Sequence, residues 1–355
     1  MINLPDRYLD VIQYLTGGGM SDTFICKDKN LSRRVVIKSL KHGIEKYRLI
    51  DELTALANIR SQYVVQVLDV IKDGDDVVGF VEEYIDGTDL KPLRSGVSEI
   101  DILKFLYPIA AGICDIHNSG RLHRDLKPDN MKLDIEGVLK IFDFGLAKMA
   151  NGAKTKQFFY TQGYTAPEAF QQDAFGVHHF TEAVDVYAFG MIALWALSDG
   201  VLPSALCEVP PKTVKVPKNF QQSHVALGAD LVQLLDSTLS SDPSLRPSMF
   251  EVKEQLGARL LRDRHRMLIT HQGTTYVVEA SNRTVKLSAG QDVVTIYYDG
   301  VKFFVTSVTG HVRHNNQQMS NGYVLEGSSV IVLGDPSAGY RTSITADISH
   351  PEVTL

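Results

Sequence analysis

A run of polar residues near the middle of the chain contains the side chains that phosphoryl transfer requires. Residues 123–130 read His-Arg-Asp-Leu-Lys-Pro-Asp-Asn, and residues 143–145 read Asp-Phe-Gly. Transfer of a phosphoryl group needs a carboxylate that orients the attacking hydroxyl, and cations that neutralise the charge on the phosphate oxygens. Asp125 can accept the proton of that hydroxyl, and Lys127 can reach the transferred phosphate. Asn130 and Asp143 offer oxygen ligands of the kind that magnesium prefers.

This run resembles the catalytic loop and the metal-binding turn of the eukaryotic-type protein kinases. A lysine two residues after the aspartate, here Lys127, is typical of the serine/threonine branch of that family. The resemblance implies that ATP donates the phosphate and that Mg²⁺, or alternatively Mn²⁺, is the metal. It also implies that serine and threonine hydroxyls of protein substrates, including the chain itself, are the acceptors. The Gly-Gly-Met of residues 18–20 is similar to bacterial members of the family.

Further residues resemble the family's nucleotide site and follow one another in the expected order. Lys38 ends the run Val-Val-Ile-Lys and is similar to the lysine that holds the α- and β-phosphates. Glu52 stands where the family places the ion-pair partner of that lysine. Glu83 and Ile85 belong to a segment that resembles the hinge offering backbone groups to adenine, and Asp89 is placed to contact the ribose.

Three residues resemble structural parts of the same family. Glu168 ends an Ala-Pro-Glu segment like the one that closes the activation loop, and its expected partner is the arginine Arg246. Asp185 matches the aspartate that braces the catalytic loop. A buried charge is tolerated only when it is paired, so we expect these side chains to have structural roles. The resemblance covers roughly residues 8–260.

The glycine-rich loop departs from the family pattern. Residues 16–21 read Thr-Gly-Gly-Gly-Met-Ser where the family has Gly-x-Gly-x-x-Gly. The remaining glycines still let the backbone approach phosphates closely, so we expect ATP to bind with reduced affinity. Thr23, in place of the valine that usually covers adenine, points the same way. Glu82 holds a position before the hinge that often carries an apolar residue. The nucleotide contacts expected from the loop are Thr16, Gly17, Gly18 and Gly19.

The segment between Asp143 and Glu168 is where we expect regulation. Because Arg124 precedes Asp125, the resemblance implies a basic pocket that an activation-loop phosphate can order. Thr155, flanked by two lysines, is the first candidate for that phosphate. Thr161 matches the family threonine that contacts the catalytic aspartate and lysine, although Tyr160 stands where a glycine is common.

The pattern of apolar residues predicts an α+β chain with two domains. Residues 8–85 alternate short apolar runs with turns, which predicts strands at 63–68 and 77–81, and one helix is expected at about 47–58. Helical patterns follow from about 100 to 260, and strand patterns return at 275–278, 293–298, 303–305 and 330–333. With the resemblance, this layout implies a bilobal kinase domain over residues 1–262 and a small all-β domain over 263–355.

The C-terminal β domain resembles a forkhead-associated domain in its strand spacing and in its closing run, residues 322–334. Such domains are β-sandwiches that can recognise phosphothreonine through an early Gly-Arg and a later Ser-x-x-His. Gly290-Gln291 is the nearest counterpart of the first motif, and residues 263–355 contain no counterpart of the second. The phosphate-recognition residues therefore do not carry over. A degenerate sandwich of this type and an unrelated β module that docks substrates or covers the kinase both stay open.

Composition limits the remaining function classes. The chain has 355 residues, a hydrophobic fraction of 44% and a net charge of −6, which is typical of a folded globular protein and argues against general nucleic-acid binding. Its three cysteines are far apart and indicate packing residues in a reducing compartment rather than disulfides or a zinc site. Neither a secretory signal nor a membrane-spanning stretch is expected, so the sequence predicts a cytoplasmic protein.

Two other functions are compatible with a similar fold. A pseudokinase scaffold, which binds nucleotide and acts through its β domain, is favoured slightly by the altered glycine-rich loop. It is disfavoured by a complete set of Lys38, Glu52, Asp125, Asn130 and Asp143, which a scaffold does not need. A small-molecule kinase would not require the peptide-docking segment around Thr161 and Glu168. By analogy with bacterial members, a partner phosphatase is expected.

Overall fold

The chain forms two compact units in the computed structural model. The structure describes residues 4–15, 21–40, 46–149, 154–155, 158–211, 220, 227–335, 337 and 341–350. The first unit comprises Met1–Lys253 and the second Glu254–Leu355. The division falls inside helix α5 (Met249–Leu261), at whose end the sequence predicts the domain boundary.

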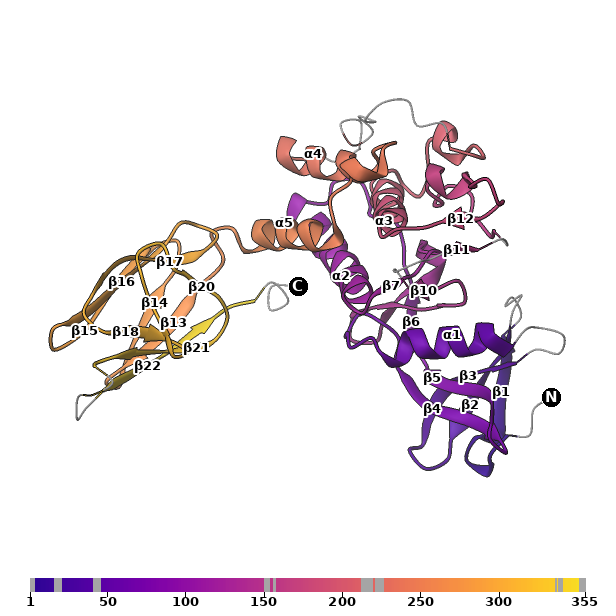
Figure 1. The fold of residues 1–355 in the computed structure, drawn as a ribbon, viewed down its shortest axis with the longest axis horizontal. Coiled ribbons are helices and arrows are strands. Elements are labelled where there is room, and N and C mark those ends of the chain that lie inside the picture. Colours follow the sequence, from indigo (N-terminus) through magenta and orange to yellow (C-terminus); the bar gives the residue numbers. More distant parts are fainter. Residues whose placement is uncertain are drawn as a thin grey trace. The chain divides into compact units, whose positions relative to one another are not determined.

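An antiparallel five-stranded sheet begins the first unit, in the order β1-β2-β3-β5-β4, and helix α1 lies against it (Figure 1). β-Branched and aromatic residues of β2, β3 and β5 pack with Tyr8 into one apolar cluster. The register places Lys38 of β3 opposite Phe80 of β5, so the lysine has a fixed position on the sheet. The predicted helix at 47–58 is confirmed as α1. The bounds of these elements are β1 (Asp10–Leu15), β2 (Ser21–Asp28), β3 (Arg33–Leu40), α1 (Lys46–Ala57), β4 (Val67–Asp73) and β5 (Asp76–Glu83).

The strand predicted at residues 63–68 is wrong for most of its length, because β4 begins only at Val67. Tyr63, Val64 and Val65 are buried. Their backbone bonds Ile141, the last residue of β9 (Leu139–Ile141), instead of a strand of the five-stranded sheet: Ile141 N donates to Tyr63 O at 2.8 Å, and Val65 N donates to Ile141 O at 2.9 Å. This apolar run ties the sheet to the helical part of the unit. The apolar composition of this segment is therefore explained by its burial and not by an extension of β4.

Helices dominate the rest of the first unit. Helix α2 (Glu99–Asn118) begins with a capping box in which Ser98 and Asp101 exchange hydrogen bonds. Helix α3 (Ala183–Ala196) is apolar around its whole circumference and almost entirely buried, as expected of a central helix. The other helices of this part are η2 (Pro128–Asn130), η3 (Pro167–Phe170), η4 (Ser204–Cys207), α4 (Ala229–Thr238) and η6 (Pro243–Leu245).

Short strand pairs carry the loops between these helices. Strands β6 (Gly87–Asp89), β8 (Met131–Asp134) and β9 (Leu139–Ile141) form one small sheet. β7 (Arg121–Leu122) pairs with β10 (Lys148–Met149), and β11 (Lys154–Thr155) pairs with β12 (His178–His179). The β7–β10 pair joins the two ends of residues 123–147, which positions the polar run singled out by the sequence.

Two antiparallel sheets make up the second unit. One has the order β14-β13-β22-β21-β18-β19 and the other β15-β16-β17-β20 (Figure 1). Alternate residues of both sheets meet in one apolar core that includes Ile296, Phe303 and Ile344. All four predicted strand segments fall in strands. The bounds are β13 (Met267–His271), β14 (Thr274–Val278), β15 (Thr284–Ala289), β16 (Asp292–Tyr298), β17 (Phe303–Thr309), β18 (Val312–His314), β19 (Gln317–Gln318), β20 (Val324–Leu325), β21 (Ser329–Leu333) and β22 (Thr342–Ile348).

Among the described residues, no helix combines the length and the apolar composition that crossing a bilayer requires.

Candidate active site

Lys38 of β3 lies among three carboxylates. Its Nζ is 2.5 Å from Glu52 Oε1 of α1, 3.4 Å from Glu82 Oε1 of β5 and 3.9 Å from Asp143 Oδ1. Lys38, Glu52 and Glu82 are all buried, whereas the side chain of Asp143 is 53% exposed. One ammonium therefore faces three carboxyl groups, two of them without access to water.

The charge states of this cluster follow from burial and proximity. Burial alone would lower the pKa of Lys38, but the neighbouring carboxylates of Glu52, Glu82 and Asp143 raise it above its ordinary value, so the lysine stays charged. Burial raises the pKa of Glu82 to about 7, and the Lys38 charge only partly opposes it. Glu82 thus titrates near neutrality. Its Oε1 has no hydrogen-bond partner among the residues that the structure describes.

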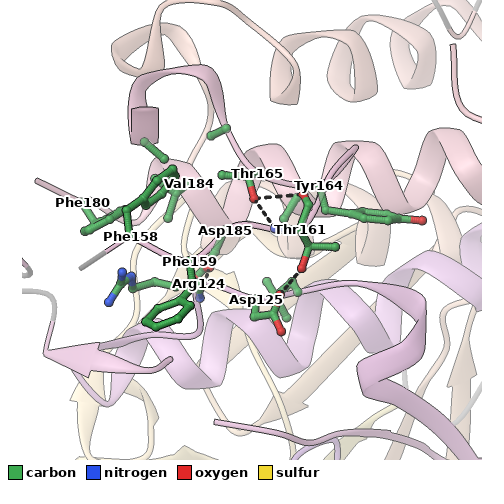
Figure 2. A pocket seen from close by; sticks show the side chains of 14 residues that line it. Arg124, Asp125, Phe158, Phe159, Thr161, Tyr164, Thr165, Phe180, Val184 and Asp185 are labelled. Atoms are coloured by element: carbon green, nitrogen blue, oxygen red, sulfur yellow. Dashed lines mark hydrogen bonds between the residues drawn. The ribbon is translucent and has the colours of Figure 1, made fainter. Parts of the chain in front are cut away.

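Asp125 is the centre of a second polar group (Figure 2). Its Oδ1 accepts a hydrogen bond from Thr161 Oγ1 at 2.6 Å, and its Oδ2 lies 2.8 Å from Lys127 Nζ. Lys127 Nζ also donates to Thr161 Oγ1 at 3.2 Å. Asn130 Nδ2 donates to the backbone oxygen of Asp125 at 2.8 Å and to Oδ2 at 3.1 Å. The carboxylate is therefore held in one orientation, and the amide oxygen of Asn130 is left available as a ligand.

The backbone of this loop is fixed by the buried Asp185 at the start of α3. Asp185 Oδ2 accepts from the backbone nitrogen of His123, and Oδ1 accepts from that of Arg124, both at 2.8 Å. His117 Nε2 contacts Oδ2 at 3.1 Å. Arg124 and Asp143 both have positive φ angles, 71° and 66°. Non-glycine residues adopt this strained conformation only where surrounding contacts impose it, which is common at functional sites.

Glu168 and Arg246 form a two-pronged ion pair. Arg246 Nη1 donates to Glu168 Oε1 at 2.6 Å, and Nη2 donates to Oε2 at 2.9 Å. The arginine side chain is fully buried, and its remaining donors bond the backbone oxygens of Ser240 and Ala183. Because every charged group is paired, this contact anchors the segment after Thr161 to the helical part of the unit.

Arg124 and Asp125 line one pocket, together with Phe158 and Phe180 of an aromatic cluster (Figure 2). Its guanidinium carbon lies 3.9 Å from the centroid of the Phe180 ring, and Nη1 donates to Leu146 O at 3.2 Å. Burial lowers the pKa of Arg124 to about 10. The cavity beside it has a volume of about 20 Å³, which is room for one water molecule. The cluster consists of Phe158, Tyr160, Phe170, His178 and Phe180.

Comparison with known proteins gives this arrangement a family. The model of the protein kinase domain matches residues 9–256. The chain belongs to the protein kinase domain family.

Curated relatives include serine/threonine kinases of bacteria and plants. A probable serine/threonine-protein kinase of Clostridium perfringens is 31% identical over 264 residues, which is 68% of this chain and 36% of that protein. A serine/threonine-protein kinase of Corynebacterium efficiens is 30% identical over 66% of this chain and 47% of its own. A CBL-interacting serine/threonine-protein kinase of Arabidopsis thaliana is 31% identical over 59% and 48%. The chain thus spans about a third to a half of these relatives.

The residues expected to bind nucleotide lie on several elements of the kinase domain. Thr23 of β2 is opposite Lys38 in the sheet. Glu83 ends β5, and its carboxylate lies 3.0 Å from Lys140 Nζ, while Ile85 follows in an irregular segment and is half-buried. Asp89 is largely exposed and lies 3.6 Å from Lys132 Nζ. The residues expected from the glycine-rich loop, Thr16, Gly17, Gly18 and Gly19, fall outside the described part of the chain.

Sequence reasoning noted Glu82 only as a departure and did not assign it to Lys38. The available signal was a charged residue directly after the apolar run of residues 77–81. The histidine that contacts Asp185, His117, was not singled out, because one histidine in an apolar helix carries no pattern. Phe180, which lies against Arg124, belongs to an aromatic cluster whose members come from residues 158 to 180, and only the fold brings them together.

Proposed function

We propose that the chain is a protein serine/threonine kinase that transfers the γ-phosphate of ATP to serine and threonine hydroxyls of proteins, including itself. The observation that carries this proposal is the contact of Asp125, Lys127 and Thr161 around one oriented carboxylate. The names of the bacterial relatives support it. In this role Asp125 orients the attacking hydroxyl and holds its proton, while Lys127 neutralises charge on the transferred group.

The donor chemistry of the site fits a divalent cation and a nucleotide. Asn130 and Asp143 present oxygen ligands, which suit Mg²⁺, and the cluster around Lys38 has more carboxylates than cations. When bound, the metal would neutralise charge on the phosphates of ATP. Lys38, held by Glu52, would bind the α- and β-phosphates, and the backbone at Glu83 and Ile85 would face adenine. Oxygen donors of this kind suit both Mg²⁺ and Mn²⁺, so Mg²⁺ is proposed with Mn²⁺ as the alternative.

The remaining proposals concern architecture and regulation. The sheet with α1 and the helical part after residue 99 fit the two lobes of a kinase. The two sheets around one core in the second unit fit a β-sandwich, of which a degenerate forkhead-associated domain is one type. Thr155 stays the proposed activation-loop phosphosite. It lies opposite His178 in the β11–β12 pair, two residues before Phe180, whose ring lies against the Arg124 guanidinium.

Location and partners are proposed on narrower grounds. Three free cysteines, two of them buried, support a reducing compartment such as the cytoplasm. A partner phosphatase would make the phosphorylation reversible, which is what a regulatory threonine such as Thr155 requires.

The test is transfer of label from γ-labelled ATP in the presence of Mg²⁺, using the wild type, Asp125→Ala and Lys38→Ala. Phosphosites are mapped by mass spectrometry, and Trp195 fluorescence checks that each variant is folded. Label on serine or threonine in the wild type alone supports the kinase. If all three proteins bind nucleotide but transfer no label to themselves or to a basic acceptor protein, the scaffold function replaces it. Label between Asp143 and Glu168 would support regulation through Thr155.

A further inference from the structure

Glu82 is the carboxylate for which the fold provides the least compensation. It is only 3% exposed, and its Oε1 has no hydrogen-bond partner within the described ranges. The 3.4 Å contact with Lys38 Nζ is an ion pair without a hydrogen bond, whereas Glu52 makes a 2.5 Å hydrogen bond to the same nitrogen. Glu82 is therefore the weaker partner of a shared cation.

The other groups around Glu82 cannot replace Lys38. Its neighbours in the sheet register are Val36 of β3 and Val67 of β4, which carry no charge. Glu52 from α1 and Asp143 from the segment after β9 are acidic and repel it. If Lys38 is engaged elsewhere, Glu82 becomes a buried charge without a partner, which costs several kcal/mol unless the group is neutralised.

Binding of a nucleotide phosphate to Lys38 would leave Glu82 without its partner. The phosphates compete for the Lys38 ammonium and bring further negative charge close to Glu82. The half-exposed Asp143 is in contact with water, and Glu52 keeps its short hydrogen bond to Lys38. Glu82 is shielded from water, and its Oε1 has no such hydrogen bond within the described residues.

We propose that Glu82 is a positioning residue of the nucleotide site, which shares Lys38 while the site is empty and takes up a proton from solvent when nucleotide phosphate binds Lys38. The proposal rests on the proposed function, because it assumes that Lys38 binds phosphate. The carboxylate gains one proton from the buffer and no other bond changes. Nucleotide affinity therefore depends on pH through a residue that shares Lys38 with the phosphates.

The size of the effect follows from linkage. Glu82 of the free protein is about half protonated at pH 7, because its pKa is raised to about 7. Binding then takes up little proton at pH 6, about half a proton at pH 7 and close to one proton at pH 8. Over the last interval, the affinity of the wild type falls by up to about tenfold per pH unit.

Isothermal titration calorimetry with Mg·ADP, in pairs of buffers with different ionisation enthalpies, measures this proton uptake directly. Glu82→Gln preserves the shape of the side chain and cannot take up the proton, and Glu82→Met serves as a second variant should the amide disturb folding. Glu136→Gln is the matched control, since it removes a carboxylate from an exposed turn of the same unit. The phosphate groups of ADP can exchange protons themselves, so the relevant quantity is the difference between wild type and Glu82→Gln.

The expected result is a difference that grows from pH 6 to pH 8, is the same with Glu82→Met and is absent with Glu136→Gln. Equal proton uptake by wild type and Glu82→Gln, with nucleotide bound by both, would overturn the role of Glu82 and leave the kinase proposal standing. Absence of nucleotide binding by the wild type would instead contradict the proposed function itself.

Discussion

The two units treat buried charge differently. Within the described residues, every buried carboxylate and every buried lysine or arginine lies in the first unit, whereas the titratable groups buried in the second are three histidines and Tyr298. Burial lowers the pKa of His265 to about 4 and also lowers that of His314, so these side chains are neutral at pH 7. The second unit is stabilised by an apolar core, and the first unit also holds charges in place. A unit that binds a charged reactant needs the latter arrangement.

The first unit itself contains two kinds of buried charge. Glu168 with Arg246, and Asp185 with its three partners, are satisfied within the protein. The cluster around Lys38 has three carboxylates for one cation. The balanced groups hold the loops, and the unbalanced group is suited to receive a cation and phosphate. This difference separates structural from functional charge more clearly than burial does.

The balanced pair should give the largest stability effect. Arg246→Met leaves the Glu168 carboxylate without a partner and is expected to lower the free energy of unfolding by about 3–5 kcal/mol. Urea unfolding followed by the fluorescence of Trp195, the only tryptophan, reports on the first unit alone. The control is Arg246→Met combined with Glu168→Gln, which should recover part of the loss. A single variant within about 1 kcal/mol of the wild type would remove the basis for calling this pair structural.

Asp185→Asn should cost slightly less, about 2–3 kcal/mol, because an amide oxygen cannot replace both carboxylate acceptors. Burial alone would raise the pKa of Asp185, but the His117 contact, the nearby histidines and the backbone N–H of Arg124 lower it below its ordinary 3.8. Its stabilising effect is thus present above pH 3.8 and is lost as the pH falls through the lower folded value. The gap between wild type and variant, measured by urea unfolding, should shrink on acidification. A gap that widens there would contradict this account.

The contribution of Glu82 to stability should depend on pH in the opposite direction to that of Asp185. Because its pKa is raised from 4.5 to about 7, the folded protein binds a proton more tightly than the unfolded chain, so stability falls as the pH rises through this interval. The fall should be on the order of 1–3 kcal/mol. Glu82→Gln should flatten that part of the pH dependence while Glu136→Gln leaves it unchanged. If the free energy of unfolding depended on pH in the same way in wild type and Glu82→Gln, the pKa of Glu82 would not be raised by folding.

A substitution in the second unit should change stability least, and the change should not depend on pH. Tyr298→Phe removes the hydroxyl that donates to Gly300 O at 2.7 Å, and about 1 kcal/mol of local stability should be lost. Hydrogen exchange of peptides from β16, read by mass spectrometry at pH 6 and pH 8, measures this loss. An effect that differs between the two pH values by more than the correction for intrinsic exchange would break the contrast between the units.

Local pattern predicted much of this molecule. Helix α1 and the strands β14, β16, β17 and β21 were expected from periodicity, and the grouping of Asp125, Lys127 and Thr161 was expected from resemblance to kinases. The segment at Tyr63–Val65 was misjudged, because an apolar run indicates burial and does not say which backbone it will pair with. Glu82 and Phe180 acquire their roles from residues distant in sequence, so only the fold reveals them.

Asp125 is proposed to act in phosphoryl transfer at a site whose nucleotide contacts are made by other residues. The most direct measurement compares wild type and Asp125→Asn in the same sample conditions, with Mg·ADP affinity and the initial rate of γ-phosphate transfer both determined. We expect affinities within about threefold and a transfer rate lowered by about 10²–10⁴-fold in the variant. A variant that transfers phosphate at a rate within tenfold of the wild type would contradict it.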